Sequence, residues 1–145
     1  MSSVKEQILS QLEDTLERVD DCEGRIYRSR PEAFTREESP AINFYPVSAT
    51  VSDPYVMTHL VWLLSIRFVI VARSEGDKTP DEVADAVLIG MHSKIYADTT
   101  LDALCIGIYP RSINYQIVEG DNNACAIICD YEFQYRTALA DLTEN

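Results

Sequence analysis

Residues Leu60–Ala72 read LVWLLSIRFVIVA, and this is the strongest strand pattern in the chain. The side chains that alternate onto one face are all apolar, and most of those on the other face are apolar too. The first set is Trp62, Leu64, Ile66, Phe68 and Ile70. Two apolar faces are typical of a central strand, so we expect both sides to be covered over at least part of its length. Arg67 interrupts the second face, and we expect a structural salt bridge there because a charge among apolar side chains needs a partner.

Two helices are predicted, one before this strand and one after it. The first begins with Ser3 as N-cap and Glu6 three residues later, and an apolar stripe at helical spacing follows. The stripe consists of Val4, Ile8, Leu9, Leu12, Leu16 and Val19. The other side of this helix is acidic, and Gly24 ends it. The second helix begins with Thr79 as N-cap and Pro80 in its first turn, and it runs to about residue 97.

Four further strands complete the predicted sheet. Arg25–Ser29 and Ala41–Tyr45 flank a polar loop, and Pro46 closes the second of these strands. Cys105–Ile117 and Ala124–Thr137 form a long C-terminal hairpin around a turn at 118–123. The element order is therefore α-β-β-β-α-β-β.

This order predicts an α+β fold, in which two helices pack on one face of a mostly antiparallel sheet. One domain spanning 1–145 accommodates it, with 138–145 as a loose tail. Pro110 indicates an edge position or a bulge in its strand, because proline cannot donate a hydrogen bond to the ladder. The polar stretch Val47–Met57 fits either a hairpin tip or a loop.

The chain is strongly acidic, with 24 Asp and Glu against 12 Lys and Arg and a formal net charge of −12. Such a surface repels phosphate, which disfavours a nucleic-acid binder but is compatible with DNA that passes without sticking. The N-terminus lacks the pattern of a signal peptide and 59–72 is too short to span a bilayer, so we expect a soluble, cytoplasmic protein with no membrane partner. The cysteines show no metal-ligand spacing, and we expect Cys105, Cys125 and Cys129 to be small buried residues.

The polar loop and its entry are unusually basic. They hold Arg25, Arg28, Arg30 and Arg36, which are a third of all the basic residues. Guanidinium groups bind carboxylates through two hydrogen bonds, so this loop is a patch that an acidic copy of the same chain can bind. The alternative is that these are solvated loop charges, which contribute little.

The acidic side of the first helix, which includes Glu13 and Glu17, is the candidate complement of the basic loop. Its alternative role is simply that of a solvated helix face. Arg136, near the end of the last strand, either reaches a neighbouring copy or pairs with Asp130 or Glu132 on its own strand face.

The sequence predicts no catalytic, cofactor-binding or metal-binding residues, and we expect that the protein is not an enzyme. Asp130 and Glu132 share a strand face about 7 Å apart, which suits a general acid–base pair, but no histidine or nucleophile is grouped with them. The two histidines, His59 and His92, lack a partner at ligand spacing, and the chain has no glycine-rich phosphate loop. A solvated or channel-facing surface is the favoured role of Asp130 and Glu132.

Five short motifs are distributed along the chain, namely IYRSR at 26–30, FTREE at 34–38, PA at 40–41, DTTL at 98–101 and YRT at 135–137. Together with the element order, they resemble the tail-terminator, or tail-completion, proteins of long-tailed bacteriophages, the group that includes the lambda minor tail protein U. The resemblance implies a structural protein of the virion tail, assembled in the host cytoplasm. It also implies a ring, a hexamer, that caps the tail tube, stops its polymerisation and offers a surface for head joining.

The partners implied by this resemblance are further copies of the chain, the major tail tube protein and a head-completion or connector protein, with DNA only as passing cargo. A ring requires a heterologous interface, in which one patch meets a different patch on the neighbour. On this hypothesis the subunit or tail-tube interface contains Arg28, Arg30, Arg36, Arg136, Glu13 and Glu17. Two alternatives are an acidic inhibitor that mimics DNA and binds a basic protein, and a hydrolase that uses Asp130 and Glu132.

Overall fold

The computed structural model describes residues 2–34, 38–52, 58–118 and 124–144. Its elements are α1 (Val4–Leu16), the short 3₁₀ helix η1 (Asp20–Cys22), β1 (Ile26–Arg28), β2 (Ala41–Val51), β3 (His59–Arg73), α2 (Pro80–Tyr96), β4 (Gly107–Val118) and β5 (Ala124–Ala138). The strands form one sheet in the order β1-β2-β3-β5-β4. β1 runs parallel to β2, and every other neighbouring pair is antiparallel. The predicted α+β class and element order are confirmed.

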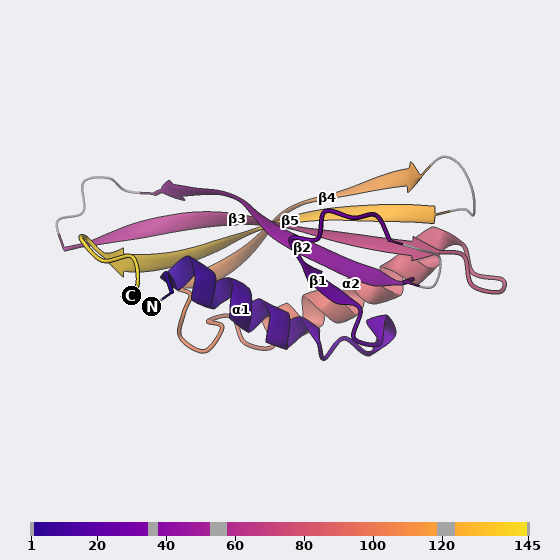
Figure 1. Ribbon diagram of the computed structural model, residues 1–145, viewed down its shortest axis with the longest axis horizontal. Helices are drawn as coiled ribbons and strands as arrows, with labels where there is room; N and C mark the ends of the chain where they lie inside the picture. Colours follow the sequence, from indigo (N-terminus) through magenta and orange to yellow (C-terminus); the bar gives the residue numbers. More distant parts are fainter. Residues whose placement is uncertain (1, 35–37, 53–57, 119–123, 145) are drawn as a thin grey trace.

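Both helices lie on the same side of the twisted sheet, as Figure 1 shows. The core fills the space between them and consists of the apolar stripe of α1, the buried side of α2 and one face of the strands. On the central strands this face carries Leu64, Ile66, Phe68 and Ile70 from β3 and Ile127, Cys129, Tyr131, Phe133 and Tyr135 from β5. Because side chains alternate along a strand, every second residue of β3 and β5 enters this core, as the sequence predicts.

Both predicted helix starts are present, but their caps differ. The Ser3 hydroxyl accepts a hydrogen bond from the Glu6 backbone N–H at 3.1 Å, which satisfies one of the free donors of the first turn. The Thr79 hydroxyl instead donates to the carboxylates of Asp81 at 2.6 Å and Glu82 at 3.2 Å. Thr79 is therefore the N-cap by position, and its side chain ties together the acidic first turn of α2.

The face of the sheet opposite the helices, here called the open face, is covered only in part. Its β3 side chains are half-buried, including Val61, Leu63 and Val69. Near one end of β3, Arg73 contacts described residues on both sides of the 35–37 gap: its backbone N–H donates to the Ser39 hydroxyl at 2.9 Å, and its guanidinium donates to the Phe34 carbonyl at 3.4 Å. The predicted cover on both faces of β3 is thus confirmed for part of its length.

The strand β2 differs from the sequence prediction. Pro46 was expected to close this strand, but β2 continues through it to Val51 with a register shift between Pro46 and Ser48. A proline is tolerated here because β1 pairs only with Ile42–Phe44, so among the described residues no strand of the same chain needs an N–H from the outer side of β2 at Pro46. The first part of the 47–57 stretch is therefore strand, and 53–57 lies outside the described residues.

The C-terminal hairpin forms as predicted, with Pro110 beside a register shift on the outer strand β4. Its turn at 119–123 lies outside the described residues. The segment after β5 was expected to be loose, yet the Ala138 N–H donates to the Glu144 carbonyl at 2.9 Å and the Val4 N–H donates to the Leu142 carbonyl at 2.8 Å. These bonds hold residues 138–144 against the start of α1, because the first N–H groups of a helix have no partner within it.

The four cysteines are buried and unpaired, which confirms the prediction for Cys105, Cys125 and Cys129. Burial raises the pKa of the Cys22, Cys105 and Cys129 thiols to about 12. These side chains therefore pack as small apolar groups rather than as reactive thiolates. Among the described residues, no helix combines the length and hydropathy needed to cross a membrane.

Candidate interaction surface

Arg28 and Arg30 lie on opposite faces of the sheet, although the sequence places them together in one basic patch. Arg28 is in register with the buried Phe44, so its side chain points to the helix side. Ser29 then adopts a left-handed conformation (φ 54°), which ends β1 and turns the chain over to the open face. The two guanidinium groups therefore cannot act as one patch.

On the helix side, the Arg28 guanidinium binds both carboxylate oxygens of Glu6. Glu6 lies in the first turn of α1, so this ion pair fastens the helix to the edge strand β1. The hydrogen bond from Arg28 lowers the pKa of the Glu6 carboxyl below its ordinary value of 4.5. The Arg28 side chain is 27% exposed, which leaves only part of it for contact with another molecule.

On the open face, Arg30 is the centre of a folded loop. Its guanidinium carbon lies 4.6 Å from the ring centroids of both Tyr27 and Phe34. One of its nitrogens donates to a Glu38 carboxylate oxygen at 2.9 Å, and that bond and the aromatic rings leave the side chain 18% exposed. The Asn43 side chain bonds both the N–H and the carbonyl of Arg30 at 3.0 Å, which anchors the loop to β2.

The arginines of this loop thus brace the chain itself. Arg25 donates to the carbonyl groups of Pro40 at 2.9 Å and Ser39 at 3.1 Å, while Arg28 and Arg30 bind Glu6 and Glu38. The expectation of a free basic patch is therefore corrected, because carboxylates and carbonyl groups of the same chain occupy these donors. Arg36 lies outside the described residues. A role of these arginines between subunits stays a prediction.

The other predicted interface residues are spread over the molecule. Glu13 is half-buried and Glu17 exposed at the C-terminal half of α1, and Arg136 is exposed near the end of β5. The carboxylates expected to pair with Arg136 are engaged elsewhere. Arg67 binds Asp130 through two hydrogen bonds of 2.9 and 3.2 Å, and Arg111 binds Glu132 at 2.8 Å.

The Arg67–Asp130 pair is the structural salt bridge that the sequence predicts. It lies on the open face, where the two residues are direct partners across β3 and β5. The hydrogen bonds that Arg67 donates to Asp130 raise the pKa of Arg67 further above its ordinary value. Because Asp130 and Glu132 each bind an arginine, neither is placed as a free acid or base for a shared substrate.

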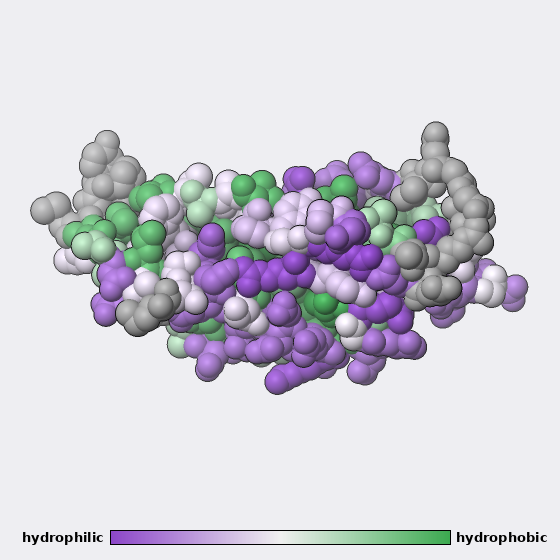
Figure 2. All heavy atoms as spheres, in the orientation of Figure 1, coloured by the Kyte–Doolittle hydropathy of each residue, from purple (hydrophilic) through white to green (hydrophobic). Residues whose placement is uncertain are grey.

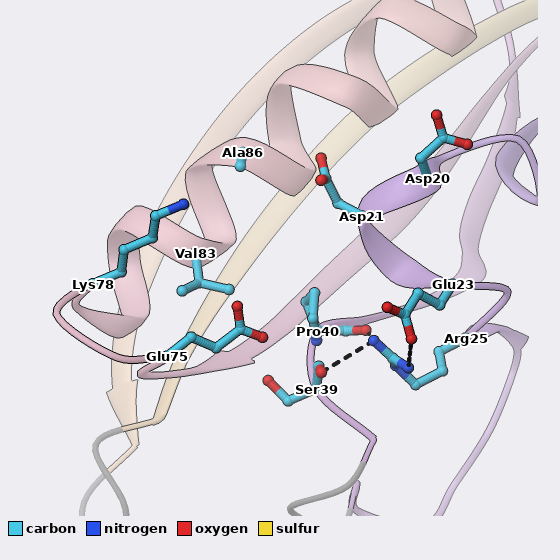
Figure 3. A pocket seen from close by; sticks show the side chains of 10 residues that line it. All are labelled: Asp20, Asp21, Glu23, Arg25, Ser39, Pro40, Glu75, Lys78, Val83 and Ala86. Atoms are coloured by element: carbon cyan, nitrogen blue, oxygen red, sulfur yellow. Dashed lines mark hydrogen bonds and ion pairs between the residues drawn. The ribbon is translucent and has the colours of Figure 1, made fainter.

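An acidic hollow lies between η1, the start of α2 and the Ser39–Pro40 peptide, as Figure 3 shows. Its volume is about 480 Å³, and its lining includes the carboxylates of Asp20, Asp21, Glu23 and Glu75 with the cations of Arg25 and Lys78. Arg25 donates to Glu23 at 3.2 Å within this hollow. Among the described residues, no group of three or more His, Cys, Asp or Glu side chains is arranged to hold a metal ion.

The feature that sequence reasoning missed is an exposed apolar edge. The described residues contain eight large hydrophobic side chains that are exposed, and four of them lie on β4 or directly before it. These four, here called the β4 apolar edge, are Ile106, Tyr109, Ile113 and Tyr115, with exposed fractions of 44–60%. The outer position of β4 explains this exposure, since α2 packs on β3 and β5. The Tyr96 hydroxyl of α2 also donates to the Ile108 carbonyl of β4 at 2.8 Å.

The opposite side of the molecule is more polar. Figure 2 shows this side, with hydrophilic side chains over α1 and hydrophobic ones gathered at the end where β2 stops and β3 begins. Val47, beside the register shift in the middle of β2, is 49% exposed.

The chain was compared with protein-family models, curated proteins and solved structures. No protein-family model and no curated protein matches the chain. Among solved structures, a chain from the virion of a native gene transfer agent particle is similar over 92% of both chains, with 11% sequence identity and a TM-score of 0.46. Likeness at this level leaves the function to be inferred from the residues of the chain itself.

Proposed function

We propose that this chain is a structural protein of a phage or prophage tail, a tail terminator that assembles into a hexameric ring on the end of the tail tube. The ring stops polymerisation of the tube and presents a surface for head joining. The short motifs that resemble this family motivate the specific assignment, and the surface of the chain supplies an independent reason to expect self-assembly.

The β4 apolar edge carries this proposal. Its members lie on both faces of one edge strand, with Tyr109 on the open face and Ile113 on the helix side, so they form no single flat patch. Exposed apolar side chains along both sides of a sheet edge support a contact in which another protein covers that edge. Edge strands also carry unpaired N–H and C=O groups, which proteins cover or protect with charges, prolines or bulges. β4 has Pro110 and a register shift near its start, and the rest of the strand has little protection of this kind. Among residues 107–118, Arg111 is the one charged side chain, and it is held by Glu132.

The distribution of charge fits a ring through which DNA passes. The net charge of −12 repels phosphate, and the described loop arginines Arg25, Arg28 and Arg30 bind carboxylates and carbonyl groups of the same chain. DNA therefore meets few free cations on the described surface near this loop. The same acidity also suits the DNA-mimic alternative, so the two proposals must be separated by the partner that the protein binds.

The deciding measurement is the mass of the purified protein by light scattering coupled to size exclusion, over a range of concentrations, with negative-stain images of the largest species. Ring-shaped particles near six times the chain mass of 16.4 kDa are expected for a tail terminator. A monomer at all concentrations that binds a basic protein, with affinity falling steeply as salt rises, would favour the DNA mimic instead.

A further inference from the structure

The sheet ends in two open edges among the described residues. One edge is β4, a single strand of twelve residues. The other edge is composite: β1 covers β2 only at Ile42–Phe44, so β1 forms its first half and the outer side of β2 from Pro46 to Val51 forms its second half. Residues 47–50 on this second half are exposed.

The directions of the strands allow these edges to join head to tail. β4 is antiparallel to β5, β5 to β3 and β3 to β2, while β1 is parallel to β2. A second copy placed beside the first in the same orientation therefore presents β1 and β2 antiparallel to β4. An antiparallel joint of this kind continues the hydrogen-bonded ladder from one copy to the next on either side of Pro46 and Pro110, which have no N–H to donate.

The two edges also bend at the same level of the sheet. Pro46 of β2 is in register with Ile66, Ile66 with Tyr131, and Tyr131 with Pro110 of β4. A register shift follows each of the two prolines. A bulge bends its strand and increases the local twist, so each edge has a kink beside this common level. Because β2 and β4 run in opposite directions, the two register shifts lie on opposite sides of it.

The same register places side chains for the joint. Ile113 is level with Arg28 through Phe44, Phe68 and Cys129, and these residues share the helix side. Tyr109 is level with Ser48 through Glu132 and Ser65 on the open face. Joining the edges would bury the exposed Ile113 and Tyr109 against residues of the neighbouring strand. The burial of this apolar surface lowers the free energy of the assembled state.

We propose that the edge strand β4 of one copy pairs antiparallel with the composite β1–β2 edge of the next copy, with the two proline kinks side by side. The occupant of each edge is thus a second copy of this chain. The contact is heterologous, so repetition closes a ring in which the sheets form one continuous wall. The biological role of this contact rests on the proposed tail-terminator ring, but the contact itself can be tested separately.

Cysteine cross-linking tests the contact directly. Ser48→Cys and Tyr109→Cys each place a thiol on an exposed site of one edge, while the native cysteines are buried. When the two variants are mixed and mildly oxidised, a covalent dimer is expected in the mixture and not with either variant alone. A short bismaleimide, which links two thiols over a longer distance than a disulfide, repeats the test. It still detects the contact if the register between the two strands differs by two residues. Leu139→Cys, which is also exposed, replaces Tyr109→Cys in the control mixture.

Three outcomes separate this inference from the proposed function. Cross-linking of Tyr109→Cys with itself would indicate a symmetric contact between two β4 strands and would overturn the inference. Rings without the mixed cross-link would also overturn it while leaving the tail-terminator proposal intact. Mixed cross-links in open chains without rings would uphold the edge contact and count against the ring.

A second variant tests the energetic role of the edge. Tyr115→Lys adds a charge to the β4 apolar edge, where the tyrosine is 60% exposed and the monomer needs no repacking. The concentration for half-assembly should rise about tenfold or more, because lysine on an edge opposes strand pairing. Leu139→Lys, with a side chain of similar exposure that follows the end of β5 and belongs to neither β4 nor the composite edge, should leave assembly unchanged. Equal assembly of the two variants would argue against the edge contact.

Discussion

The two faces of the sheet are built from different interactions, and adjacent residues of β3 show the contrast. Phe68 points to the helix side, where its ring centroid lies 5.7 Å from that of Phe44 and 5.4 Å from that of Tyr131. Arg67 points to the open face, where it binds Asp130 in a pair that is partly exposed. One face therefore holds the fold together through buried apolar area, whereas the other is left free to carry polar groups and to meet other molecules.

Replacing Phe68 should produce the largest loss of stability. Phe68→Ala removes a fully buried ring from the centre of the aromatic cluster, and the cavity should lower the free energy of unfolding by about 3–5 kcal/mol. Urea unfolding followed by circular dichroism measures the change. The matched control is Val69→Ala on the same strand, whose half-buried side chain lies on the open face and should cost about 1 kcal/mol. Equal losses from both variants would show that the two faces contribute alike.

The salt bridge of the open face should contribute less. A double-mutant cycle with Arg67→Met and Asp130→Asn isolates the coupling between the two side chains. We expect a coupling energy of about 1 kcal/mol, because both groups are partly exposed and water screens their attraction. Urea unfolding at low and at high salt measures it, and the coupling should shrink as salt rises. A coupling that exceeds the loss caused by Phe68→Ala would reverse the comparison between the faces.

Much of the fold follows from periodicity in the sequence. The stripes of α1 and α2, and the alternation in β3 and β5, depend on local spacing that any reader of the chain can count. Pro46 misled the prediction because its effect depends on the neighbouring strand: a proline ends a paired strand, but it is tolerated where β1 has already stopped. The length of β1 is set by the left-handed Ser29, and no strong sequence signal predicts that conformation at a serine.

The surface was harder to predict than the core because it too depends on how distant parts of the chain are placed, and not on local spacing. The arginines are close together in the sequence, but the turn at Ser29 places Arg28 and Arg30 on opposite faces of the sheet. There each guanidinium binds a carboxylate of its own chain. The β4 apolar edge was missed because alternation cannot tell an edge strand from a central one. That distinction depends on the strand order and on how far α2 reaches, which are properties of the whole fold.

The smallest expected effect concerns the ion pair that fastens α1 to the helix side of β1. Glu6→Gln should lower the free energy of unfolding at about pH 7 by roughly 0.5–1 kcal/mol, since the Glu6 side chain is 35% exposed and screened by water. Arg28 lowers the pKa of Glu6 in the folded state, so the folded protein holds fewer protons at this site than the unfolded chain. The stabilisation is thus present above the ordinary pKa of 4.5 and is lost as the pH falls through the folded-state value.

The difference in stability between the native chain and Glu6→Gln should therefore shrink on acidification from about pH 7 to about pH 3, as measured by urea unfolding at each pH. Glu17→Gln is the matched control, because Glu17 caps the C-terminal end of the same helix and is exposed. A carboxylate at that end faces the negative pole of the helix dipole, so its removal should be neutral or slightly stabilising at about pH 7. A constant difference for Glu6→Gln across this pH range would mean that the contact depends on packing rather than on charge, and the helix side would then be purely apolar in its energetics.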